Sequence, residues 1–131
     1  MELQDKVKRR KDSGNMFLRY KKSFFHALDG IKYAIKNEHN FIIILMAIII
    51  TTLFGFAFKI NEYEWLFVIT SFGLVSGSEM LNSAIEAAID LETTKSHPLA
   101  KVAKDCGSGA TLVFAFTSFI GALIIFVPKI F

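Results

Sequence analysis

The stretch at residues 41–58 (FIIILMAIIITTLFGFAF) carries no ionisable side chain and limits the folds open to this chain. A helix needs roughly 17–25 apolar residues to cross the hydrocarbon core of a bilayer. Two further stretches, 65–89 and 107–127, are also mostly apolar. Because unpaired backbone groups are very costly in lipid, such segments cross as helices. The sequence therefore predicts an all-α membrane protein with three transmembrane helices, at about 41–58, 65–89 and 107–127.

The basic residues are distributed unevenly around these spans. Ten of the fifteen Lys and Arg residues precede Phe41. The connection between the second and third spans holds Lys95, Lys101 and Lys104, whereas the connection at 59–64 holds one Lys and two Glu. Cytoplasmic loops carry an excess of Lys and Arg. We therefore expect the N-terminus and residues 91–105 in the cytoplasm, and the C-terminus outside.

A helical pattern of apolar residues precedes the first span. They recur at steps of three and four, with basic residues on the other faces: Phe17, Tyr20, Phe24, Leu28, Ile31 and Ile35. This spacing predicts an amphipathic helix at about 16–37 that lies along the inner leaflet. A soluble helix packed on another domain is the alternative, but the rest of the chain supplies no such domain. Residues 1–15 are polar and basic, and we expect them to be disordered.

Four polar residues interrupt the second span: Glu79, Asn82, Glu86 and Asp90. Their spacing places them on one helix face. Ionisable residues at membrane depth are costly and usually mark a functional site. Carboxylates this close repel one another unless a proton or a cation intervenes. Because Mg²⁺ is usually held by one or two carboxylates together with substrate phosphates, the stripe is a candidate Mg²⁺ site.

The start of the third helix supplies positive charge. Pro98 suits the first helical turn and Ser96 is a possible cap. Lys101, Lys104 and Asp105 then fall on adjoining faces, followed by small residues at 107–109 that would permit close approach. The chain has neither a GxxxxGK[ST] loop nor a protein-kinase signature, so any nucleotide site must be built differently.

The remaining ionisable residues give weaker signals. On spacing alone, the carboxylates of Glu38, Glu62 and Glu64 are best interpreted as solvated groups at helix ends. The three histidines have no metal-ligand spacing, so we expect them to be solvated or interfacial: His26, His39 and His97.

Two sequence blocks resemble the prokaryotic integral-membrane diacylglycerol kinase family, which includes the undecaprenol kinases of Gram-positive bacteria. GSEMLNSAIEAAIDL matches the signature E-x-x-N-[ST]-A-I-E-x-x-x-D at 79–90, and HPLAKVAKDCGSGATLV matches an A-K-D block followed by small residues. The resemblance covers about residues 24–128. GSGAT departs from the AAGAV-like stretch of undecaprenol kinases toward a GSAAV-like form, whereas HPLAKVAKD and the C-terminal IIFVPK favour the Gram-positive group.

The resemblance implies a lipid kinase domain at 16–131, forming a homotrimer in the bacterial cell membrane and using MgATP to phosphorylate a lipid alcohol. It implies that Glu79 is the general base and that Glu38 and Glu86 bind Mg²⁺. The residues implied to orient metal, phosphates and nucleotide are Asn82, Glu86, Asp90, Lys104 and Asp105. Undecaprenol is the expected acceptor, with diacylglycerol also possible, and no nucleic-acid partner is expected.

Two other classes of protein fit part of the pattern. In a small proton- or cation-coupled transporter subunit, the buried carboxylates would carry protons or cations. That reading explains Glu79 and Glu86 but not Lys104 and Asp105. In a purely structural trimer, the polar stripe would hold helices together. Such an interface seldom needs three carboxylates on one stripe.

Overall fold

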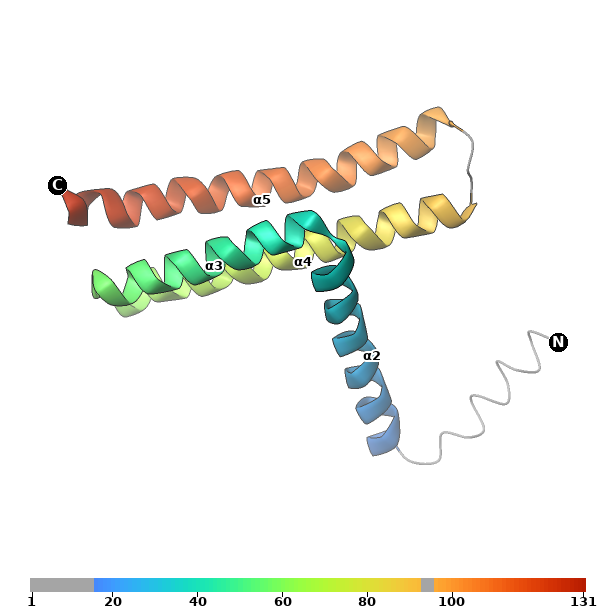
Figure 1. The fold of residues 1–131 in the computed structure, drawn as a ribbon, viewed down its shortest axis with the longest axis horizontal. Coiled ribbons are helices and arrows are strands. Elements are labelled where there is room, and N and C mark those ends of the chain that lie inside the picture. Colours follow the sequence, from blue (N-terminus) through green and yellow to red (C-terminus); the bar gives the residue numbers. More distant parts are fainter. Residues whose placement is uncertain (1–15, 93–95) are drawn as a thin grey trace. The chain divides into compact units, whose positions relative to one another are not determined.

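The structure, a computed structural model, describes residues 16–92 and 96–131. All regular elements in these ranges are α-helices: α2 (Met16–Asn37), α3 (His39–Ala57), α4 (Glu62–Glu92) and α5 (Pro98–Ile130) (Figure 1). The prediction of an all-helical protein is confirmed for this part of the chain. The predicted disordered segment 1–15 and Lys95 lie outside the described residues.

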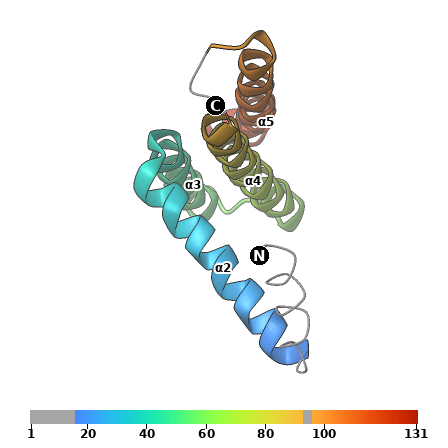
Figure 2. The ribbon, with the colours of Figure 1, turned by 90° about the vertical axis from the view of Figure 1, so that its right-hand side faces the viewer.

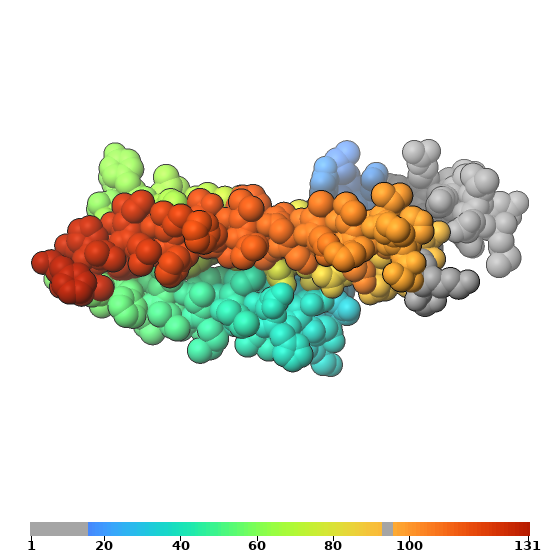
Figure 3. Space-filling view, turned by 90° about the horizontal axis from the view of Figure 1, so that it is seen from above, coloured from blue at the N-terminus to red at the C-terminus, as the bar shows by residue number. Residues whose placement is uncertain are grey.

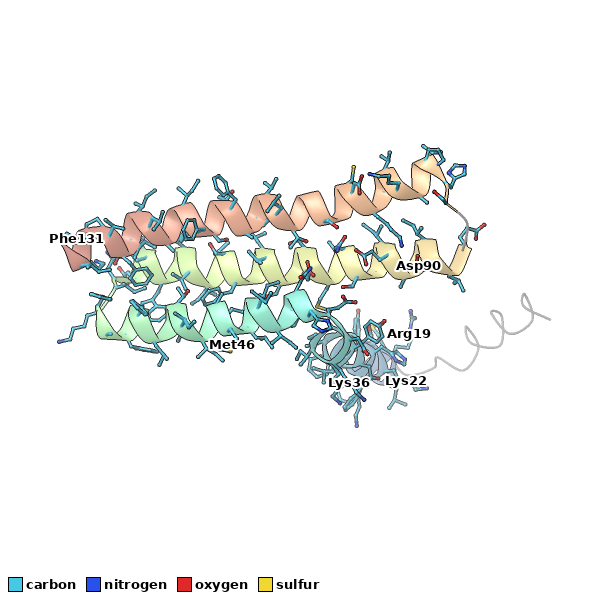
Figure 4. All side chains as sticks on the ribbon, turned by 45° about the horizontal axis from the view of Figure 1, so that its top comes forward. Arg19, Lys22, Lys36, Met46, Asp90 and Phe131 are labelled. Atoms are coloured by element: carbon cyan, nitrogen blue, oxygen red, sulfur yellow. The ribbon has the colours of Figure 1, made fainter. Side chains whose placement is uncertain are left out.

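Helix α2 exposes both apolar and basic side chains. Ala34 is its only buried residue. Phe17 and Phe24 are 73% and 62% exposed, and Figure 4 labels Arg19 and Lys36 among its basic residues. The described residues up to Tyr33 belong to a different compact unit from the rest of the chain. An exposed apolar face beside basic residues suits a helix that lies on a lipid surface.

Helices α3, α4 and α5 belong to the second unit, Ala34–Phe131. Helix α4 packs against both others, more extensively against α5, and lies between them in the view of Figure 2. Their buried cluster gathers where α3 turns into α4, which we call the hairpin end: Ile60, Val68, Ile125 and Phe126. Phe54 meets Phe126 edge-on there, with ring centroids 6.0 Å apart. The three helices therefore converge at the hairpin end.

The turn between α3 and α4 is short because α3 ends in a Schellman motif. The N–H of Ile60 donates to Gly55 O at 3.1 Å, and the N–H of Lys59 donates to Phe56 O at 3.2 Å. These bonds satisfy carbonyls that the helix end leaves unpaired. Lys59 adopts φ 49°, a left-handed conformation that glycine more often supplies. Burial of Ile60 holds this turn against the bundle.

Two of the helices have the length and composition to cross a membrane, α3 and α5. Only 11% of the most apolar window of each is buried, so their apolar side chains point outward rather than into a protein core. In the space-filling view α5 runs along the whole length of the bundle (Figure 3). Helix α4 is not among the helices that pass this test in the described ranges, because its polar stripe lowers its hydropathy.

The first turn of α4 is held by side chains, which corrects one expectation. Asn61 Oδ1 accepts from the N–H groups of Tyr63 and Glu64, both at 3.0 Å, and Glu64 Oε2 accepts from Asn61 N at 2.8 Å. Glu64 Oε1 also pairs with Lys129 Nζ at 3.0 Å. The prediction that Glu64 is simply solvated is wrong, because the end of α5 returns to the hairpin end and brings Lys129 beside it.

This arrangement predicts a pH-dependent contribution to stability. The backbone N–H of Asn61, and then the Lys129 ammonium, lower the pKa of the Glu64 carboxyl below its usual 4.5. A lowered pKa stabilises the fold above the unfolded value, and this contribution is lost as pH falls through the lower folded value. Glu64→Gln should therefore lower the melting temperature at pH 7 and change it much less near pH 3. Thermal unfolding in detergent micelles measures the melting temperature at both pH values.

Glu62→Gln is the matched control, because Glu62 lies exposed in the same helical turn. It should leave the melting temperature unchanged at both pH values. Equal destabilisation by Glu64→Gln at pH 7 and pH 3 would contradict the ionic contribution.

Candidate active site

The polar stripe of α4 runs from a buried position to an exposed one. Glu79 is 2% exposed and is the largest fully buried side chain among the described residues. Asn82 is 6% exposed, Glu86 is half-buried and Asp90 is exposed. Since a helix rises about 1.5 Å per residue, the stripe spans roughly 16 Å. One end of it is thus sealed from water and the other is open to it.

Close approach of α5 seals the inner end of the stripe. A Cβ atom at Gly107 would collide with Asn82 Oδ1, so the absence of a side chain at Gly107 allows this contact. Asn82 Nδ2 donates to Glu86 Oε1 at 3.1 Å, which fixes the orientation of that carboxylate. The small residues predicted to permit close approach are therefore used in that way at Gly107.

The other end of α4 and α5, which we call the polar end, carries two ion pairs. Lys104 Nζ on α5 pairs with Asp90 Oδ1 on α4 at 2.5 Å, and Lys101 pairs with Asp105 one turn along α5. Figure 4 labels Asp90 near the end of α4. Exposed pairs of this kind contribute only about 0–1 kcal/mol to stability. Their charges are therefore easily exchanged for those of a ligand.

The start of α5 corrects a second expectation. His97, not Ser96, is the N-cap, and its Nδ1 accepts from the N–H of Leu99 at 3.2 Å. Pro98 occupies the first helical turn, as predicted. The ring of His97 is exposed, as predicted, and it also caps the helix.

Glu38 lies at the start of α3 with its carboxylate unused by the helix. Its backbone is extended, its side chain makes no capping bond, and its carbonyl accepts from Phe41 N at 3.1 Å. Helices α3 and α4 run side by side from the same short turn. After the 19 residues of α3, Glu38 therefore reaches about the level of Asn82 on α4. This register brings Glu38 to the same depth as the polar stripe.

The carboxylates suit a metal ion only in combination with a ligand. Within residues 16–92 and 96–131, no three His, Cys, Asp or Glu side chains cluster in a way that could hold a metal ion. Glu38 and Glu86 offer hard oxygen donors at similar depth. One or two carboxylates that share an ion with substrate phosphates are the usual arrangement for Mg²⁺. The donor set fits Mg²⁺ bound together with a nucleotide.

Two buried polar atoms in the described part of the chain have no hydrogen-bond partner, Asn82 Oδ1 and Thr111 Oγ1. The sequence analysis singled out Asn82 but missed Thr111. The available signal was a hydroxyl in the mostly apolar third span, which also holds Ser108, Thr117 and Ser118. The sequence analysis counted Lys101 among the positive charges of the third helix but not among the site residues, although Lys101 pairs with the predicted site residue Asp105.

Comparisons with known proteins point to one family. The family model described as prokaryotic diacylglycerol kinase matches residues 25–126. Undecaprenol kinase of Bacillus subtilis is 42% identical over 92% of this chain and 98% of its own. A diacylglycerol kinase of Helicobacter pylori is 38% identical over 74% and 76% of the two chains, and that of Escherichia coli K12 is 32% identical over 74% and 80%.

The sequence of this all-helical chain is thus similar to those of bacterial lipid kinases. The chain belongs to the prokaryotic diacylglycerol kinase family, whose model covers most of its length. It is a lipid kinase, and the family resemblance predicted from the two sequence blocks is confirmed. The transporter interpretation is left without support.

Proposed function

We propose that this protein uses MgATP to phosphorylate undecaprenol at the cytoplasmic side of a bacterial cell membrane. The observation that carries the proposal is the stripe on α4, which joins a sealed carboxylate, Glu79, to an exposed cluster of charges around Asp90 and Lys104. Phosphoryl transfer to a lipid needs both environments, one for the lipid hydroxyl and one for the nucleotide. The similarity to an undecaprenol kinase along nearly the whole chain supports the choice of acceptor.

In the proposed arrangement α3, α4 and α5 all cross the membrane. The basic residues before α3 and the polar end face the cytoplasm, and the hairpin end and Phe131 face outward. Helix α2 lies along the inner leaflet. Helix α4 exposes Leu81 and Ile85 beside the stripe, which leaves an apolar surface for other subunits or lipid. Together with the family resemblance, this surface supports a homotrimer.

At the nucleotide end, the roles follow from charge and position. Glu38 and Glu86 would hold Mg²⁺, which supplies charge neutralisation across the β- and γ-phosphates. Asn82 keeps the Glu86 carboxylate in place through its 3.1 Å bond. Lys104 exchanges its partner Asp90 for the phosphate oxygens of the nucleotide. Asp90 and Asp105 then orient the nucleotide. These residues position the reactants and balance charge, which is most of what phosphoryl transfer requires.

At the lipid end, Glu79 accepts the proton of the acceptor hydroxyl. As that proton moves to the Glu79 carboxylate, the lipid oxygen forms a bond to the γ-phosphorus and the bond to the β–γ bridging oxygen breaks. The products are a lipid phosphate and ADP. Glu79 is almost fully buried, so bulk water does not compete for its carboxylate. A positioned base of this kind typically contributes about 10²–10⁴-fold to the rate.

The first test concerns the acceptor. The purified protein should phosphorylate undecaprenol with a higher kcat/KM than diacylglycerol in mixed micelles of matched composition. Transfer of labelled γ-phosphate to extracted lipid measures both rates. Faster turnover of diacylglycerol would reverse the assignment, and transfer to neither lipid would remove the proposed function.

The second test concerns the base. Glu79→Gln keeps the size of the side chain but cannot accept a proton, so kcat should fall by about 10²–10⁴-fold. MgATP affinity should change little. Because a buried neutral amide is less costly than a buried carboxylate, the melting temperature should be at least that of the parent. Glu92→Gln, exposed on the same helix, is the control. Loss of MgATP binding with an unchanged kcat would instead assign Glu79 to the metal site.

The third test concerns the metal. Glu86→Gln and Glu38→Gln each remove one proposed ligand, so the Mg²⁺ concentration for half-maximal activity should rise and the maximal rate should fall. Glu62→Gln at the hairpin end should leave the Mg²⁺ titration unchanged. A normal Mg²⁺ titration in Glu38→Gln would return Glu38 to the role of a solvated carboxylate.

A further inference from the structure

A cavity of about 270 Å³ lies among α3, α4 and α5. All three helices contribute to its wall, and most of the lining is apolar. The lining includes Ala47 and Thr51 on α3, Ser71 and Val75 on α4, and Ala115 and Phe119 on α5. Ligand sites for small molecules usually measure roughly 300–1,000 Å³. This cavity is large enough for part of a lipid chain but not for a whole long-chain lipid.

The cavity lies beyond the end of the bundle at which aromatic side chains join α3 and α5. Phe54, Phe58 and Phe126 pack together at the hairpin end, with ring centroids about 6 Å apart. Farther along, small side chains at Ala47 and Ala115 face the space between the helices. Large aromatic residues thus hold α3 and α5 together at the hairpin end, and small residues leave room beyond it.

The cavity begins one helical turn from the proposed base. Val75, which lines it, and Glu79 are both buried on α4 and lie four residues apart. Close contacts of Gly107 with Asn82 and of Gly121 with Phe67 fix the antiparallel register of α4 and α5. In that register Thr111 lies at the level of Glu79. A molecule in the cavity could therefore extend directly to Glu79.

Thr111 adds a polar group at this junction. Serine and threonine in helices commonly donate to the carbonyl four residues earlier. Thr117 and Ser118 do so on the same helix, at 2.9 and 2.7 Å. Thr111 Oγ1 is buried without any partner. A buried hydroxyl left unpaired costs about 1–3 kcal/mol, so a ligand that pairs with it gains that interaction.

We propose that the cavity binds the first isoprenoid units of a polyprenol, and that Thr111 hydrogen-bonds the hydroxyl presented to Glu79. This inference rests on the proposed function and adds the path of the lipid chain. A polyprenol is a single apolar chain that ends in a hydroxyl. The cavity is likewise mostly apolar along its length, with Thr111 and Glu79 at one end. Diacylglycerol would bring ester carbonyls to the same place, and burying them unpaired would be unfavourable.

The main test fills the cavity. Ala115→Phe places a ring in it, whereas Val113→Phe adds the same ring on an exposed part of α5 that does not line it. Ala115→Phe should raise KM for a long polyprenol about tenfold or more, since misfits in apolar pockets cost about 10–200-fold. The KM for a five-carbon prenol, too short to fill the cavity, and the KM for MgATP should change little. Val113→Phe should change none of them.

An unchanged KM for the long polyprenol would overturn the chain site, as would an equal loss with the short prenol. The former would indicate a cavity filled by bulk lipid only, and the latter a general disturbance of the active site. Should Ala115→Phe fail to fold, Ala47→Phe enters the cavity from α3 and applies the same criteria. Failure of the parent protein to phosphorylate any prenol would instead remove the proposed function.

A second set of variants tests the hydroxyl in the same assay. Thr111→Val should raise the KM for long and short prenols alike, and Thr111→Ser should restore it. Because Val removes a buried unpaired hydroxyl, the melting temperature should stay the same or rise. Thr117→Val, which removes a hydroxyl already paired within α5, is the control. If Thr111→Val and Thr117→Val gave the same prenol KM, Thr111 would have no role in lipid binding.

Discussion

The cost of burying a carboxylate governs this bundle. Glu79 is sealed within a helix whose neighbours suit hydrocarbon, and an ionisable group in such a place is expensive. Helix α4 must therefore turn its polar face toward protein rather than lipid. Gly107 allows α5 to close over that face, and the Asn82–Glu86 bond keeps the adjoining polar groups in place. Such a costly arrangement is most easily understood as part of a functional site.

This constraint also explains why the three helices of the bundle expose different kinds of surface. Because α4 keeps its stripe covered, α3 and α5 present the apolar surface, and most of that surface is exposed in the single chain. Aromatic packing joins all three helices at the hairpin end, where no chemistry is proposed. The opposite end of the α4–α5 pair carries the exchangeable charges. Stability and reactivity are therefore concentrated at different depths of one bundle.

The helices and the polar stripe could largely be predicted from the sequence, but the side-chain contacts between helices could not. Helical spacing alone puts Glu79, Asn82 and Glu86 on one face. Contacts between helices depend instead on register, which the turns and helix tilts set together. The sequence therefore gave no sign that Glu64 would meet Lys129. Ser96 was wrongly chosen as the cap because the ring of His97 takes that role. Thr111 was missed because nothing in the sequence sets it apart from the other hydroxyl residues of the third span.

The proposed ATP site must also be stable when no ATP is bound, and the charges at the polar end allow this. Asp90 and Lys104 neutralise each other across the two helices, and Lys101 neutralises Asp105 within α5. Both pairs are largely exposed, so water lowers the cost of separating them. Phosphate oxygens can then replace Asp90 as the partner of Lys104, and a cation can take up the freed carboxylate. The proposed site would thus change partners without leaving a buried charge unpaired, while Glu79, whose burial is costly, would stay sealed.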